Sequence, residues 1–417
     1  MKPLDRFLKE HRELTRRYFL RLGGAGMGLA VSAGRVRGNE ISPELAGAIA
    51  ALEPYLTAQD EFRDVSRGKP LPHKLPDEKK SEVGMTRDTW KLEVISDPDH
   101  PADIRKPMTR NAGTALGFSD LMQLAKKHAV RFPKVMTCLN IGCPLGMGVW
   151  EGVPLREIFW LTQPRADLRR VFYHGYHNDD PEQLFQSSLP MDRVLEDPFD
   201  LPPVILCYKL NGEWLTSERG GPVRMVVPEA YGFKSVKWLQ QIVLTNLFHA
   251  NDTYANGNND VDSAMKTWAA TLSIPRKVKP QQPIPVTGYA QVGISGLKKV
   301  QVWMEAKDQP ATETGRYYAT APWVDAEILP PPKRGAGQWK GMDDSMGMIG
   351  FNEGEPKEWP LQLTRVHWAA LLPGLPAGRY TFRCRTIDQQ DHAQPMPRPF
   401  RKSGHASIEQ VSVTVEA

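Results

Sequence analysis

Four cysteines and one histidine-rich run are the parts of this chain whose residue types could do chemistry directly. Cys138 and Cys143 lie five residues apart, whereas Cys207 and Cys384 lie inside apolar, strand-like runs and are expected to be core residues. A thiolate is a soft ligand that suits a high-valent metal, and the metal keeps the sulfur deprotonated; the other interpretation of Cys138 is a core thiol. His177, in a His-Gly-Tyr-His run, could exchange protons near neutral pH, although such histidines are as often structural.

The composition is that of a folded chain too long for one ordinary core. Its 417 residues are 41% hydrophobic and 24% charged, which predicts two or three domains. The 34 Gly and 36 Pro residues follow no collagen-like period and favour a loop-rich α+β or β architecture over a helical bundle. A formal charge of +5 is far below that of duplex-binding proteins, so we expect no nucleic-acid partner.

The first 39 residues have the layout of an export signal. Basic residues precede the adjacent pair Arg16 and Arg17, and a weakly apolar stretch rich in Gly and Ala follows at 22–33. This order resembles a twin-arginine signal, which directs proteins across a membrane already folded. The alternative is an amphipathic surface helix with a chance arginine pair. We therefore expect periplasmic localisation, with a cofactor inserted before export.

The elements that position these groups begin with an irregular lead-in over residues 40–85. A strand at 90–94, a helix at 118–130 and further short strands follow, which predicts an α+β domain over residues 40–280.

The remaining residues, 281–417, have a different texture. Runs of alternating polar and apolar residues, separated by Gly/Pro turns, predict an antiparallel β-sandwich resembling an immunoglobulin fold. The clearest runs are 300–304, 380–384 and 411–415. An insert at 317–360 breaks their spacing and is expected to be a long loop.

Two segments of the α+β domain carry closely spaced motif residues. The first has Cys138 at the end of a strand and a W-x-G-x-x-L segment at 150–155. The second has N-G at 211–212, G-x-P-V-R-x-V-V-P at 220–228 and V-K-W-L at 236–239. In this order they resemble the molybdopterin-binding domain of the sulfite oxidase family, and within it the branch of sulfane dehydrogenase molybdenum subunits. The C-terminal sandwich resembles the family's dimerisation domain.

The resemblance implies a molybdenum centre carried by molybdopterin. It assigns Cys138 as the protein ligand to molybdenum, with further sulfur ligands from the pterin dithiolene. The phosphate of the pterin needs basic side chains and N–H groups around it. The resemblance gives this cofactor-binding role to His73, Arg219, Arg224, Lys234, Ser235 and Lys237.

Departures from the family concern the substrate side. No arginine follows Cys138, where sulfite oxidases carry one that holds the anionic substrate, and the family's upstream arginine has no secure counterpart, although Arg67 lies nearby. The family's active-site tyrosine is replaced by Phe185, which removes a hydroxyl capable of proton transfer. Arg401 matches the spacing of a C-terminal arginine that reaches the site in relatives, an ordinary surface arginine being the alternative. We therefore expect a less cationic pocket, with Cys138, His177, Phe185 and Arg401 around the reacting centre, and weak or absent sulfite oxidation.

The sequence thus predicts an exported molybdenum oxidoreductase that transfers an oxygen atom to or from a small sulfur or nitrogen compound, an oxyanion or a sulfoxide. No haem-binding domain precedes the motifs, so electrons would pass to or from a separate cytochrome or membrane redox subunit. We expect a homodimer or a heteromer. The alternatives are a sulfoxide reductase of the same fold and a non-catalytic binding subunit.

Overall fold

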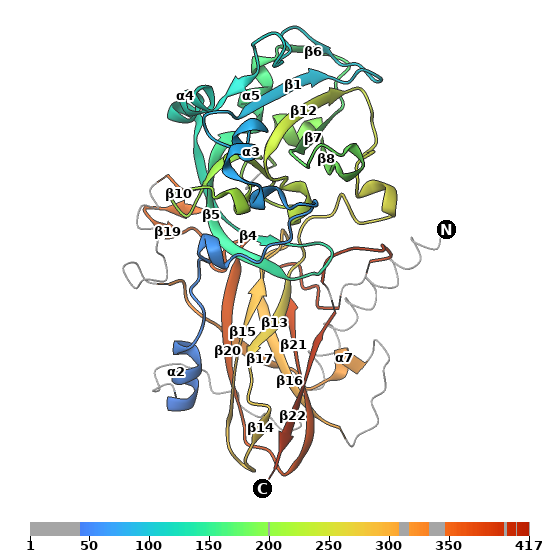
Figure 1. The fold of residues 1–417 in the computed structure, drawn as a ribbon. Helices are drawn as coiled ribbons and strands as arrows, with labels where there is room; N and C mark the ends of the chain where they lie inside the picture. The colour runs from blue at the N-terminus through green and yellow to red at the C-terminus, as the bar shows by residue number, and fades with distance from the viewer. Residues whose placement is uncertain are drawn as a thin grey trace, which may run out of the picture.

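The computed structural model describes residues 42–198, 201–307, 317–332, 347–395, 398–405 and 407–416. The expected export signal and part of the expected loop at 317–360 lie outside these ranges. The chain forms an upper α+β part and a lower part made mainly of strands (Figure 1). Within the described ranges, no helix combines the length and the apolar character that crossing a bilayer requires.

The lead-in is irregular, as expected, and runs along both parts. Its elements are α2 (Pro43–Ala50), η1 (Gln59–Glu61), η2 (Pro72–Lys74) and α3 (Asp77–Glu82). Ser42 caps α2 by accepting a hydrogen bond from the Leu45 N–H at 3.3 Å. Figure 1 shows α2 beside the lower part and α3 against the upper part.

Two five-stranded sheets build the upper part. The first has the order β3 (Leu116–Gly117), β1 (Lys91–Ser96), β12 (Leu239–Thr245), β7 (Arg170–Gly175) and β8 (Gln186–Pro190). The second has the order β10 (Glu213–Trp214), β9 (Ile205–Leu210), β5 (Pro144–Pro154) and β4 (Val130–Thr137), and β11 (Arg224–Val226) pairs with β9. The helices of this part are α4 (Phe118–His128), α5 (Leu155–Leu161) and α6 (Met191–Leu195). The strand and helix expected at 90–94 and 118–130 therefore form within a residue or two of the predicted bounds.

The core of the upper part forms because apolar side chains from both sheets meet. Leu92 and Val94 alternate inward from β1, and Tyr173 does so from β7, all of them fully buried. Trp90 is 1% exposed and donates its indole N–H to the Leu239 carbonyl at 2.6 Å. This bond fixes the start of β1 to the end of the V-K-W-L motif.

Short elements connect the strands of the upper part and lead on from it: β2 (Asp103–Ile104), β6 (Pro164–Ala166), η3 (Pro181–Gln183), η4 (Ser217–Arg219), η5 (Gly232–Lys234) and η6 (Ala255–Gly257). Three more lie between strands of the lower part: α7 (Tyr317–Thr320), β18 (Phe351–Asn352) and β19 (Glu355–Pro356).

The lower part is one path of eight hydrogen-bonded strands. The order is β13 (Trp268–Ser273), β15 (Ile284–Gln291), β20 (Arg365–Leu372), β17 (Val324–Ile328), β16 (Lys299–Ala306), β21 (Gly378–Ile387), β22 (Glu409–Val415) and β14 (Lys277–Val278). The three predicted alternating runs are confirmed as parts of β16, β21 and β22. Two strands, β13 and β14, precede the predicted boundary at residue 281. The immunoglobulin-like topology itself stays a prediction.

The strand that ends at the candidate metal ligand is tied to the lower part. In β4, the Val135 N–H donates to the Leu363 carbonyl at 2.8 Å, and the Thr137 hydroxyl donates to Oε1 of Gln291 at 2.5 Å. Both donors are fully buried. The lower part therefore holds the end of β4 in place, which fixes where Cys138 begins the next turn.

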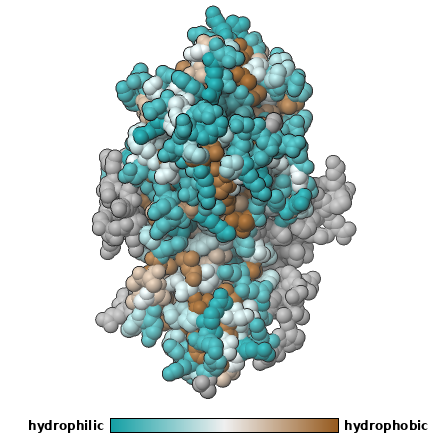
Figure 2. Space-filling view, in the orientation of Figure 1, coloured by the Kyte–Doolittle hydropathy of each residue, from teal (hydrophilic) through white to brown (hydrophobic). Residues whose placement is uncertain are grey.

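The outer surface in the view of Figure 2 is mostly hydrophilic, with hydrophobic residues in a narrow band along the middle of the upper part and in smaller groups at its top and over the lower part. Scattered exposed apolar residues are normal for folded chains.

Candidate active site

A cavity of about 300 Å³ lies in the upper part, within the size range of small-molecule sites. Its walls come from the lead-in, the turn after β4, the segment after β7, the η4 to η5 region and the loop before η6. The predicted site residues that line it are Cys138, His177, Phe185, Arg219, Arg224, Ser235 and Lys237. The fold thus brings most of the predicted set to one place.

Cys138 opens the turn that joins β4 to β5. Its N–H donates to the Cys143 carbonyl at 3.2 Å, and the Gly142 N–H donates back to the Cys138 carbonyl at 2.9 Å. Gly142 has a φ of +58°, and a Cβ there would lie 2.8 Å from the backbone N of His405. A glycine is therefore needed where the C-terminal segment packs on this turn. The turn leaves Cys138 half-buried and lining the cavity, without a disulfide partner among the described residues.

Two buried arginines form the core of the predicted phosphate cradle. Arg219 is 3% exposed and donates to the Phe62 carbonyl at 2.9 Å and to Glu218. Arg224 is 5% exposed and donates to the carbonyls of Arg219 at 2.8 Å and Ser235 at 2.6 Å. Burial lowers the pKa of Arg224 to about 10. In both guanidinium groups, Nε is buried and has no hydrogen-bond partner among the described residues.

Lys237 also lines the cavity, but its ammonium group already donates hydrogen bonds to other residues of the protein. Nζ donates to Oδ1 of Asp64 at 3.0 Å, to Oγ of Ser66 at 2.7 Å and to the Glu218 carbonyl at 2.6 Å. Burial and the neighbouring Arg224 lower the pKa of Lys237 to about 8, against the pull of Asp64. Lys237 therefore gives the cradle a positive charge that can be removed just above neutral pH.

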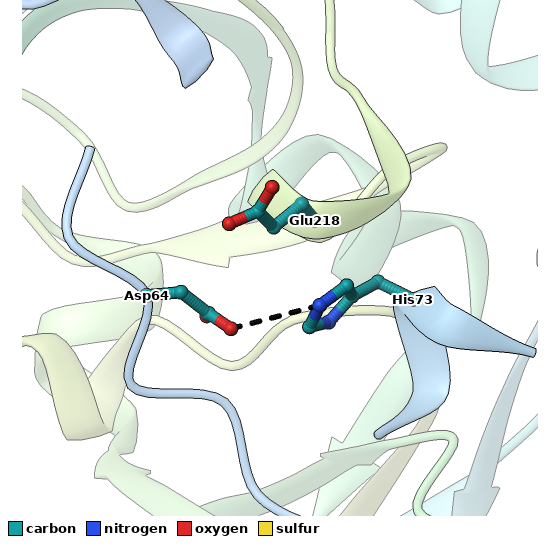
Figure 3. A group of neighbouring side chains, drawn as sticks. All are labelled: Asp64, His73 and Glu218. Carbon is teal, nitrogen blue, oxygen red and sulfur yellow. Dashed lines mark ion pairs between the residues drawn. The ribbon is translucent and has the colours of Figure 1, made fainter. Parts of the chain in front are cut away.

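Beside the cradle, Asp64, His73 and Glu218 form a cluster of metal-ligand type. Their ligand atoms lie within 4.8 Å of one another, and Figure 3 shows Asp64 and His73 pointing toward each other with Glu218 above them. His73 Nε2 lies 3.7 Å from Oδ2 of Asp64, and its ring stacks on Trp238 at 6.3 Å. Because the Lys237 ammonium already compensates Asp64, we interpret this cluster as part of the cradle wall and not as a metal site.

His73 does not line the cavity, although it contacts residues that do. Its side chain is 8% exposed, and Nδ1 has no partner among the described residues. Burial lowers the pKa of His73, against the opposing effect of Asp64. The ring is therefore held beside the cradle but outside the cavity lining, and its contact with the cofactor stays a prediction.

Two predicted residues point elsewhere. Lys234 is 4% exposed and donates to the Ser188 carbonyl at 2.7 Å, with Nζ 3.7 Å from Oδ2 of Asp252, so it does not line the cavity. Arg401 is exposed, and its backbone N–H donates to the Asn258 carbonyl at 3.1 Å; it does not line the cavity either. Motif spacing placed both residues near the site but could not indicate which way their side chains turn.

The cavity also has an aromatic and cationic wall. The Arg67 guanidinium lies 5.1 Å from the centre of the Phe185 ring. His177 lines the same wall, and burial, followed by repulsion from Arg67, lowers its pKa, so the imidazole is neutral at pH 7. Arg63 also lines the cavity and donates to Sγ of Cys143 at 3.5 Å. The lead-in thus supplies two arginines to the cavity: Arg67, which the sequence comparison placed only nearby, and Arg63, which it did not single out. Positive charge is therefore present although no arginine follows Cys138.

Sequence reasoning also missed Tyr254. It lies in a polar, irregular segment and carries no spacing signal, yet it is 7% exposed and lines the cavity. Its hydroxyl donates to Oδ1 of Asn140 at 2.9 Å.

The residues present fit a molybdopterin. The orphaned Nε donors of Arg219 and Arg224 match a phosphate that accepts hydrogen bonds, because a buried unpaired donor is costly until a ligand satisfies it. The Cys138 thiol on the same cavity is the soft donor that a high-valent metal requires. Gly220, with a φ of +99°, allows the cradle loop to approach Lys237, since a Cβ there would lie 2.7 Å from Cγ of Lys237.

Comparison with known proteins gives the same result. The family model for the oxidoreductase molybdopterin binding domain matches residues 84–252. The uncharacterized oxidoreductase YuiH of Bacillus subtilis is 29% identical over 172 residues, covering 40% of this chain and 71% of that protein. The mitochondrial sulfite oxidase of Drosophila melanogaster is 26% identical over 227 residues, covering 46% of this chain and 39% of that protein. An NADH nitrate reductase of Volvox carteri is 31% identical over 163 residues, covering 32% of this chain and only 18% of that protein.

Among solved structures, the sulfane dehydrogenase SoxCD from Paracoccus pantotrophus has a similar fold. The TM-score is 0.56 at 16% sequence identity, and the match covers 94% of this chain and 96% of that chain. The fold, the domain match and the cavity agree: over residues 84–252 the chain carries an oxidoreductase molybdopterin-binding domain of the kind found in sulfite oxidases and nitrate reductases, and this domain lies in the upper part.

Proposed function

We propose that this enzyme is exported and transfers an oxygen atom to or from a small anionic sulfur compound. A nitrogen oxyanion is the second candidate substrate. The observation that carries the proposal is the placement of Cys138, Arg67 and His177 on one cavity, which the cationic cradle also lines. The bound cofactor supplies two-electron oxygen-atom transfer. In the oxidising direction, one oxygen atom from water ends in the product, and two protons and two electrons leave the site.

The chain's own residues have two tasks at this wall. Arg67 has no carboxylate partner among the described residues, so its charge is available to an anionic substrate. Neutral His177 can accept one of the protons released in the oxidising direction. Val65 and Ile141 are 40% and 45% exposed and line the same cavity, which favours a substrate with an apolar portion beside its anionic group.

The electron partner is proposed to be a separate subunit. The fold of this chain resembles that of the sulfane dehydrogenase SoxCD, and we take SoxCD as the guide to the partner. A heteromer with a redox subunit is therefore favoured over an isolated homodimer.

A panel of activities tests the proposed reaction. Sulfite and thiosulfate are offered with an artificial electron acceptor, and sulfoxides are offered with a reduced dye. Turnover of an anionic sulfur compound in the first arm is expected, and turnover confined to sulfoxides would favour the reductase alternative. Because Arg63 and Arg67 restore positive charge to the pocket, sulfite itself is now an expected substrate.

Export is tested separately with Arg16→Lys and Arg17→Lys together. The double variant is expected to stay in the cytoplasm, because twin-arginine signals are read through their arginine pair. Arg6→Lys with Arg12→Lys, an equal change outside the pair, is expected to leave export intact. Efficient export of the Arg16/Arg17 variant would remove the localisation proposal and leave the catalytic one standing.

A further inference from the structure

Tyr254 presents the only phenolic hydroxyl among the described residues that line the cavity. That hydroxyl donates to Asn140, two residues beyond Cys138 in the turn that begins at the thiol. Tyr254 is 7% exposed and lines the cavity, so its ring is largely shielded from bulk solvent.

The ring of Tyr254 packs on Phe185, which stands where the family has a tyrosine and therefore lacks its hydroxyl. Its centre lies 5.5 Å from that of Phe185 in an edge-to-face contact and 4.8 Å from that of Phe233 in a stacked contact. Lys402 lies over the same ring, with Nζ at 5.3 Å. These contacts fix the ring, so the hydroxyl has a defined position beside Phe185.

A buried acid positions the loop that carries this tyrosine. Oδ1 of Asp252 accepts from the N–H groups of Tyr254 at 3.1 Å and Ala255 at 3.0 Å. Oδ2 accepts from the Ser188 hydroxyl at 2.9 Å and lies 3.7 Å from Nζ of Lys234. Asp252 thus connects the loop to β8, the strand that directly follows Phe185.

Backbone contacts reinforce this connection. The Thr253 N–H donates to the Gln186 carbonyl at 3.2 Å, and the Gln186 N–H donates to Oγ1 of Thr253 at 3.0 Å. Phe185 and Tyr254 are therefore held as one unit, although they are far apart in the sequence.

We propose that Tyr254 supplies the phenolic hydroxyl of the substrate wall, in place of the one that Phe185 lacks, and that Lys234 and Asp252 are its positioning residues. The inference rests on the proposed function, because it assumes that an anionic substrate binds at this wall. A substrate oxygen competes with Oδ1 of Asn140 for the single phenolic proton, and a charged acceptor makes the stronger hydrogen bond.

The decisive variant is Tyr254→Phe, which keeps both ring contacts and removes only the hydroxyl. The holoenzyme is expected to retain its molybdenum and its melting temperature. Its KM for the panel substrate with the highest turnover is expected to rise about tenfold or more, the loss of one hydrogen bond to a charged group. The electron paramagnetic resonance spectrum of its Mo(V) state in the presence of that substrate is expected to change as well.

Two further variants separate an effect of the lost hydroxyl from an effect on folding. Tyr254→Phe combined with Phe185→Tyr returns a hydroxyl to the neighbouring ring and is expected to recover most of the lost KM. Tyr380→Phe removes a hydroxyl that donates to the Pro376 carbonyl in the lower part, and it is expected to change neither readout.

The outcomes distinguish this inference from the proposed function. An unchanged KM and an unchanged Mo(V) spectrum in Tyr254→Phe would overturn the role of Tyr254 alone. Loss of molybdenum in Tyr254→Phe would make the hydroxyl structural and would also overturn it. A wild-type protein without molybdenum, or without turnover of any compound in the panel, would overturn the proposed function and this inference with it.

Discussion

Nζ of Lys237 and Oδ1 of Asp64 lie 3.0 Å apart, although 173 positions separate the two residues in the sequence. The pair joins the irregular lead-in to the V-K-W-L motif at the edge of the cavity. It also sets the charge of the cradle, because the carboxylate compensates one of its buried cations. The lead-in is therefore a structural part of the cofactor site.

Asp64→Asn is predicted to lower stability by about 1–3 kcal/mol, because Lys237 loses its charged partner. Burial alone would raise the pKa of Asp64, but Lys237 and Ser66 outweigh it and lower the pKa from 3.8 to about 2. The carboxylate thus contributes stability above pH 3.8, and this contribution is lost as the pH falls through about 2. Thermal unfolding between pH 2 and pH 6 measures both effects.

The control for this change is Asp77→Asn, which removes a carboxylate that is 97% exposed and paired with Lys80. Its effect is predicted to stay within about 0.5 kcal/mol. Equal losses in the two variants would contradict a special role for the Asp64 pair.

The charge on the cradle is predicted to fall as the pH rises through about 8, where Lys237 loses its proton. The lowered pKa means that the charged form is disfavoured in the folded protein, and a bound anion should favour it again. Sulfate affinity of the cofactor-free protein is therefore predicted to weaken between pH 7 and pH 9, measured by calorimetry. A Cys138→Ser background removes any contribution from the thiol.

Lys237→Arg, introduced into Cys138→Ser, keeps its positive charge between pH 7 and pH 9. It is predicted to make the sulfate affinity nearly independent of pH. A sulfate affinity that does not change with pH in Cys138→Ser, which retains Lys237, would show that this ammonium does not set the cradle charge.

Gly175→Ala is predicted to be strongly destabilising. A Cβ at this position would lie 1.9 Å from the Lys237 carbonyl oxygen and 2.6 Å from that of Trp238, and both are backbone atoms that cannot turn away. We expect the melting temperature to fall by about 5 °C or more, together with a loss of pterin. Gly47→Ala, in α2, has nothing within 4 Å and is predicted to be neutral or slightly stabilising.

The sequence was sufficient for the features that local patterns encode. Alternation predicted β16, β21 and β22, and the family resemblance predicted a shared site for Cys138 and Arg224, both of which line the cavity. The strands depend on residues close together in the chain, whereas the distant pair Cys138 and Arg224 was brought together by the resemblance.

The features that the sequence could not provide depend on contacts between distant segments. The hydrogen bond from Tyr254 to Asn140 joins positions 114 residues apart, and Arg67 reaches Phe185 from the irregular lead-in. Lys234 shows a second limit of the sequence comparison. It lies in the motif region, but its ammonium turns toward Asp252 and it does not line the cavity. Tertiary packing decides the direction of a side chain, and spacing alone does not.

Arg67→Gln is predicted to raise the KM for an anionic sulfur substrate by about 10- to 100-fold while kcat changes less. The guanidinium would act on the bound anion and not on the metal, so it contributes mainly to binding. Steady-state kinetics on the panel substrate measures the effect. Arg87→Gln, which removes a guanidinium 5.1 Å from the Trp214 ring in a different pocket, is the matched control. A similar KM in Arg67→Gln and wild type would exclude Arg67 from substrate binding.

The central claim is that Cys138 and the neighbouring cradle hold one molybdenum cofactor, and elemental analysis combined with pterin fluorescence tests it most directly. Protein from a host that makes molybdopterin is predicted to contain about one molybdenum and one pterin per chain. Cys138→Ser is predicted to lose activity while keeping much of the pterin, because Arg219 and Arg224 bind independently of the thiol, and Cys207→Ser should behave as wild type. Wild-type protein that contains no molybdenum, or a fully active Cys138→Ser variant, would contradict the account.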